Sequence, residues 1–171
     1  MINPSSAAWN HPARERLQAG EAVLGVTNFT PSLEAADLAA TLGFDFLWVE
    51  MEHSPVTLET LRGIVLATRA LPASVFARVP IAELWTAKRV MDQGVSGVIF
   101  PFVSSADRAL TAASACRYPP LGRRGWGAGL ATFSWPESET YYDSADRNIM
   151  TIVVVEEACA GPKRAASPPD S

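Results

Sequence analysis

Five short apolar segments recur along the chain, and a stretch with helical periodicity or helix-capping residues separates each from the next. The apolar segments are residues 22–26, 44–49, 74–79, 97–102 and 151–155. They are mostly apolar on both faces, which is typical of strands buried in a parallel sheet. The alternation therefore predicts an α/β fold whose sheet is covered on both faces or closed into a barrel.

The segments between these strands carry helix signals. Thr30 is expected to cap a helix that begins with Pro31 and that Gly43 ends, and Ser105 is expected to cap a helix that runs to Cys116. Further helices are predicted over residues 13–20, 57–70, 81–93 and 137–146, with a long loop over residues 118–135. The order of elements is thus five strand–helix units, a typical βα series.

Length and charge restrict the class of protein. The chain has 171 residues and a net charge of −4, which argues against nucleic-acid binding. The chain contains no apolar run long enough to cross a membrane, and its two cysteines cannot form a disulfide framework, so a cytoplasmic protein is expected. Residues 1–157 are predicted to form one domain, and residues 158–171, rich in small residues and proline, a disordered tail.

Polar residues follow several of the predicted strands. Glu50, Glu52 and His53 follow the second strand, Arg78 ends the third, and Glu156 follows the fifth. Because parallel strands end at the same edge of a sheet, these side chains are expected to converge. Each residue alone is more often a solvated or structural group, but together they indicate an active site.

Several segments carry a resemblance to one family, in that family's order. Residues 44–53 are similar to its "GFD…ID.EH" segment, residues 77–80 to "VRVP", and residues 88–101 to "K..LD.GA.GVI.P". Residues 117–125 closely match "RYPP.G.RG", and residues 148–156 match "N…VQIE". The chain thereby resembles the HpcH/HpaI aldolases, which include macrophomate synthase. The resemblance implies a (β/α)8 TIM barrel, of which about the first five βα units are present.

The resemblance also implies roles for individual residues. Glu156 would bind a divalent metal ion, Mg²⁺ or Mn²⁺, that stabilises the enolate of a pyruvate-type 2-oxo acid. Arg78 would contact the substrate oxyanion, and His53 would act as general base. Asp92 would support the basicity of His53. Arg124 and Gly125 would form a substrate-facing loop, for which a structural turn is an equally good interpretation.

The sequence departs from the family pattern at three places. Glu50 stands where the family has aspartate, Val154 replaces the glutamine of "QIE", and the aspartate after strand six, the second metal ligand, has no counterpart in the 15 residues that follow Glu156. Strands six to eight have no counterpart either, which suggests a truncated chain.

Three functions therefore stay open. The first is a carbon–carbon lyase of class II aldolase type acting on small 2-oxo acids, for which a monomer and a homo-oligomer both stay open. The second is a catalytically inactive remnant or partner subunit of such an aldolase. The third is a doubly wound domain that binds a phosphorylated ligand. No GxGxxG phosphate loop follows the first strand, which weighs against the third.

Overall fold

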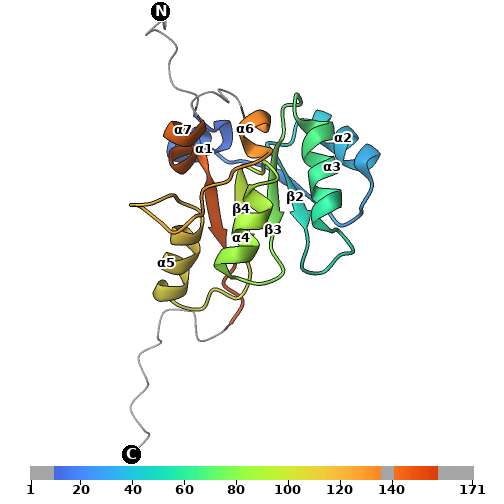
Figure 1. Cartoon of the computed structure of the whole chain (residues 1–171). Helices are drawn as coiled ribbons and strands as arrows, with labels where there is room; N and C mark the ends of the chain where they lie inside the picture. Colours follow the sequence, from blue (N-terminus) through green and yellow to red (C-terminus); the bar gives the residue numbers. More distant parts are fainter. Residues whose placement is uncertain (1–9, 136–140, 158–171) are drawn as a thin grey trace, which may run out of the picture.

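Five parallel strands lie side by side in chain order in the computed structural model, which describes residues 10–135 and 141–157 (Figure 1). The strands are β1 (Gly25–Asn28), β2 (Phe46–Glu50), β3 (Ser74–Arg78), β4 (Gly97–Phe100) and β5 (Met150–Val153). A doubly wound sheet reverses its strand order at a switch point, and this sheet has no reversal. The doubly wound alternative is therefore wrong, and the sheet is an arc of a barrel.

One helix precedes β1, and the other helices of the described residues connect successive strands. The helices are α1 (Pro12–Gln18), α2 (Leu33–Thr41), α3 (Leu58–Thr68), α4 (Leu84–Met91), α5 (Ala106–Ala115), α6 (Ala131–Ser134) and α7 (Tyr141–Asn148). The side chains of Ser32, Thr57 and Ser105 accept hydrogen bonds from the first turns of α2, α3 and α5. Within the described ranges, no helix has both the length and the apolar character that a membrane span needs.

The two faces of the sheet are packed differently. Leu47, Val49, Val75, Ala77, Val98 and Phe100 belong to a core that also contains buried residues of α2–α5. The alternate residues face the inside of the arc, where Phe46 stacks on Phe76 with ring centroids 4.6 Å apart. The register places Glu50 beside Arg78 at the end of this inner row. Strand alternation therefore buries apolar residues on the outer face of the sheet and places polar residues at the end of its inner face.

The structure corrects two predicted boundaries. β1 begins at Gly25, not at residue 22, because Asp45 accepts a hydrogen bond from Leu24 N and Arg16 donates one to Ala22 O. Gly25 itself lies against the Phe46 ring, where a Cβ atom would be 2.3 Å from the nearest carbon. The N-cap of α2 is Ser32, not Thr30, whose hydroxyl donates to Asn28 instead.

The region between α5 and β5 also differs from the prediction. The expected long loop contains α6, and the expected helix over residues 137–146 is α7, which ends at Asn148. The first part of that predicted helix lies outside the described residues, as does the predicted tail over residues 158–171.

His11, which precedes α1, packs at the edge of the sheet where the strands begin. Its imidazole is fully buried, with Nε2 3.0 Å from Ser96 Oγ and the ring 5.6 Å from that of Phe76. Burial lowers the pKa of His11 to about 4, and the charge of Arg14 acts in the same direction. The folded protein therefore holds this histidine neutral at pH values where the unfolded chain protonates it.

We expect His11 to make stability depend on pH. Between pH 6.5 and 4 the unfolded chain binds a proton that the folded chain does not, so stability falls as the pH falls through this window. The full loss is about 3 kcal/mol. Urea unfolding measured from pH 7 to pH 4 should show a shallower decline for His11→Gln than for the native sequence. Equal declines would contradict a neutral buried imidazole.

Candidate active site

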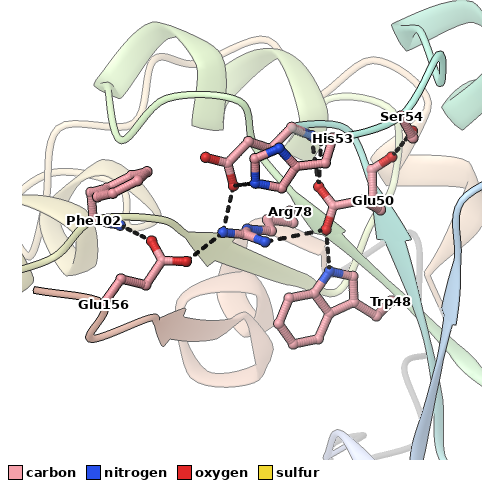
Figure 2. Close-up of polar contacts among 8 residues, drawn as sticks. Trp48, Glu50, His53, Ser54, Arg78, Phe102 and Glu156 are labelled. Atoms are coloured by element: carbon pink, nitrogen blue, oxygen red, sulfur yellow. Dashed lines mark hydrogen bonds and ion pairs between the residues drawn. The ribbon is translucent and has the colours of Figure 1, made fainter.

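Arg78, the last residue of β3, is contacted by three carboxylates, two at the end of β2 and one after β5 (Figure 2). Its Nη2 lies 2.5 Å from Glu52 Oε2 and 2.7 Å from Glu156 Oε1, and its Nη1 lies 3.5 Å from Glu50 Oε2. The guanidinium is about nine-tenths buried. These contacts are stronger than those of an exposed ion pair because the surrounding protein excludes most of the water.

Glu50 fixes the path of the chain after β2. Its carboxylate is 2 % exposed and accepts hydrogen bonds from Trp48 Nε1 at 3.2 Å and from the backbone N–H groups of Glu52 and His53 at 2.8 and 3.1 Å. The Ser54 hydroxyl donates to the Glu50 carbonyl oxygen. The turn that carries Glu52 and His53 is therefore built on the carboxylate of Glu50, which is long enough to reach both N–H groups and Arg78.

Glu156, which follows β5, contacts the same guanidinium of Arg78. One of its oxygens accepts from Arg78 Nη2, and the other accepts from the backbone N–H of Phe102 at 2.9 Å. Phe102 has a φ of 52°, an uncommon value for a residue with a side chain. Such strained residues cluster at functional sites. This conformation lets the segment after β4 hold the carboxylate that follows β5.

His53 lies at the exposed rim of this cluster. Its side chain is 64 % exposed, and Nε2 lies 3.5 Å from Glu52 Oε2, which in turn contacts Arg78. The expected convergence of His53, Arg78 and Glu156 is thus present in the structure, with Glu52 between the histidine and the arginine. Their catalytic and metal-binding roles stay predictions.

The cluster carries donors suited to a hard divalent cation, but not a full set of them. Carboxylate oxygens are the ligands that Mg²⁺ and Mn²⁺ prefer, and Glu156 is partly exposed. Yet both of its oxygens already accept hydrogen bonds from the protein. Across residues 10–135 and 141–157 no group of three His, Cys, Asp or Glu side chains is placed to hold a metal ion. The carboxylate oxygens are thus of the type that Mg²⁺ or Mn²⁺ prefers, but too few of them in the described part of the chain are placed to hold the ion.

Asp92 does not contact His53 within one chain, contrary to expectation. It follows α4 and precedes β4, toward the edge where strands begin, whereas His53 follows β2 at the opposite edge. The Asp92 carboxylate lies 3.4 Å from Arg124 Nη2. Burial raises the pKa of Asp92, and Arg124 partly offsets that rise.

Arg124 and Gly125 do not face the site either. The Arg124 side chain is completely buried, with its guanidinium carbon 4.7 Å from the ring centroid of Tyr118 and 5.7 Å from that of Tyr141. A Cβ atom on Gly125 would be 3.0 Å from Lys88 Nζ. The contacts of Arg124 and Gly125 within this chain therefore support the structural turn, and a substrate-facing role for the two residues stays a prediction.

The comparisons with known proteins agree with this fold. The family model described as HpcH/HpaI aldolase/citrate lyase matches residues 27–161. The chain belongs to the HpcH/HpaI aldolase/citrate lyase family. A family member of known structure from Burkholderia cenocepacia superimposes with a TM-score of 0.80 and 31% identity, covering 88% of this chain and 62% of that one.

Two curated relatives are aldolases. The hydroxypyruvate/pyruvate aldolase of Roseobacter denitrificans is 31% identical over 84% of this chain and 56% of its own length. The 2-keto-3-deoxy-L-rhamnonate aldolase of Shigella sonnei is 33% identical over 91% of this chain and 58% of its own length. The chain thus spans little more than half the length of these HpcH/HpaI relatives.

Sequence reasoning did not assign roles to three residues that shape the site of this HpcH/HpaI chain. Glu50 and Glu52 lie two positions apart at the end of β2, and their expected convergence with Arg78 is present in the structure, whereas their role in holding the guanidinium was not predicted. Phe102 contributes a backbone N–H at a positive φ, and nothing in the sequence signals that conformation.

We expect Arg124 to be needed for stability. Replacing it with methionine in Arg124→Met removes the cation beside Asp92 and the stacking on Tyr118, which should cost about 3 kcal/mol in urea unfolding. The exposed neighbour offers a matched control, and Arg123→Met should change stability by less than about 0.5 kcal/mol. Unchanged stability of Arg124→Met would instead favour a loop residue that contacts substrate.

Proposed function

We propose that this chain carries the catalytic edge of a carbon–carbon lyase that cleaves or forms small 2-oxo acids. The observation that supports the proposal is the joining of His53, Arg78 and Glu156 through short contacts at one edge of the sheet. The family and its aldolase relatives support the same reaction class.

The charges of the cluster favour a divalent cation as cofactor. Glu50, Glu52 and Glu156 carry a formal charge of −3 against the +1 of Arg78, so the cluster is −2 with His53 neutral. An anionic 2-oxo acid would be repelled unless further positive charge is bound. Glu156 is the residue that would hold Mg²⁺ or Mn²⁺. When bound, such an ion supplies a Lewis acid for the keto and carboxylate oxygens of the substrate.

Arg78 is suited to stabilise negative charge on the substrate. Its Nε atom is buried and has no hydrogen-bond partner among the described residues, so the protein does not use every donor of this guanidinium. An oxyanion that develops as the carbon–carbon bond breaks gains more from this donor than the neutral ground state does. The Glu50 and Glu52 carboxylates hold the guanidinium in place for that contact.

His53 is suited to move the proton. In cleavage of a 4-hydroxy-2-oxo acid, His53 takes the proton of the 4-hydroxyl group, the C3–C4 bond breaks, and its electron pair stays on the pyruvate fragment as the enolate. The aldehyde leaves, and C3 then accepts a proton to give pyruvate. Exposure of the imidazole lets it exchange the proton with solvent between steps.

Proton exchange at pyruvate tests this proposal without an acceptor. We expect the full chain with Mg²⁺ in D₂O to exchange the methyl protons of pyruvate, followed by NMR. His53→Ala and Arg78→Ala should each slow the exchange at least a hundredfold, as loss of a general base or an oxyanion donor does. Glu156→Gln should raise the Mg²⁺ concentration needed for half-maximal exchange.

Arg62→Ala, on the exposed face of α3, is the matched control and should exchange at the native rate. Circular dichroism of each variant separates a lost group from a lost fold. Exchange at the buffer rate by the native, folded chain in the presence of Mg²⁺ would refute the lyase proposal. That result would favour the alternative of an inactive relative or a partner subunit.

A further inference from the structure

A cavity of about 530 Å³ opens at the same edge of the sheet, outward from the cluster around Arg78. It lies over the ends of β3 and β4, between the loop of residues 80–83 and the first turns of α5. Pro80, Ile81, Ala82 and Pro101 make part of its wall apolar. Its size is within the range of small-molecule sites in proteins.

Two residues belong both to this cavity and to the candidate active site. Glu52 lines the cavity and contacts Arg78, and Phe102 lines the cavity while its N–H donates to Glu156. Figure 2 shows Phe102 and Glu156 side by side, next to Arg78. A molecule in the cavity would therefore lie against the groups that hold the 2-oxo acid.

The cavity wall contains one cation, Arg108, in the first turn of α5. Its Nη1 donates to the Phe102 carbonyl oxygen at 3.0 Å, which fixes the guanidinium at the wall. Among the described residues Arg108 has no carboxylate within ion-pair distance. The two carboxylates of the wall are already held elsewhere, Glu52 by Arg78 and Glu83 by Trp85 Nε1 at 2.7 Å.

Phe102 joins the two sites through its own backbone. Its N–H holds Glu156 on one side, and its carbonyl oxygen holds Arg108 on the other. The positive φ of Phe102 is the conformation in which both groups meet their partners. This residue sets the separation between Arg108 and the groups that face the reacting carbon.

Resting on the proposed lyase function, we propose that this cavity is the subsite for the aldehyde partner, and that Arg108 selects aldehydes that carry an anionic group. A carboxylate or a phosphate could each accept the free donors of the guanidinium. The apolar wall would cover the carbon chain between the anion and the carbonyl group. Arg108 is thus a specificity-determining residue, and it takes no part in the bond-breaking step.

Paired aldehydes test the proposal. The full chain is assayed for condensation with pyruvate and Mg²⁺, using D-glyceraldehyde 3-phosphate against D-glyceraldehyde, and glyoxylate against glycolaldehyde. The native chain should prefer the anionic member, and Arg108→Gln should reduce the anionic-to-neutral ratio of kcat/KM about tenfold to a hundredfold. Arg108→Glu should reduce it further. The phosphate and carboxylate pairs show which anion the subsite takes.

Arg69→Gln, an exposed arginine at the end of α3, is the matched control and should keep the native ratio. The inference is overturned if Arg108→Gln, folded by circular dichroism, keeps the native ratio while pyruvate proton exchange is intact. In that case the lyase proposal stands and the subsite does not.

A binding measurement keeps the two proposals separate if the chain exchanges no pyruvate protons. NMR titration of the full chain with D-glyceraldehyde 3-phosphate, without pyruvate or metal, should give a Kd that Arg108→Gln raises at least tenfold. D-Glyceraldehyde should bind both forms equally weakly. Equal Kd values for the phosphorylated aldehyde with and without Arg108 would overturn the subsite independently of catalysis.

Discussion

The candidate site depends on a single guanidinium that three carboxylates share. Arg78 ends β3, and its partners come from β2 and from the segment after β5, so one side chain ties together strands that are not all adjacent. Three carboxylates at one edge would repel one another in the absence of this cation. Arg78 therefore allows the acidic residues to gather, and their excess charge in turn creates the demand for further positive charge.

Much of the fold could be predicted because local rules determine it. The apolar runs predict all five strands. Ser105 is the predicted N-cap of α5 because a serine hydroxyl at the start of a helix readily accepts a hydrogen bond from the first turn. The start of β1 and the cap of α2 were missed, because Asp45 and Asn28 hold those segments through side-chain contacts. The contact of Asp45 with Leu24 joins residues distant in sequence, the contact of Asn28 with Thr30 is a local side-chain hydrogen bond, and hydrophobic periodicity reports neither.

The site residues also divide into those that the topology of the strands predicts and those that side-chain contacts determine. Residues at strand ends share an edge by topology, so His53, Arg78 and Glu156 could be brought together from the sequence alone. Asp92 and Arg124 were selected by motif, and a motif gives a residue type without giving the direction of its side chain. Arg124 is buried against Tyr118 and paired with Asp92, so the two residues hold the loop after α5 against α4 instead of facing the site.

The contacts around Arg78 involve other residues than those that fill the inside of the sheet. These contacts come from β2, β3, the segment after β4 and the segment after β5, all within one arc of the sheet. On the inner face, Phe76 and Ile99 in the middle strands are buried, whereas Ile152 on the edge strand β5 is half-buried. Within the described residues, β1 and β5 are each paired along one side only. What covers those two strand edges therefore determines how stable the arc is, while the arc by itself determines where Arg78 and its partners lie.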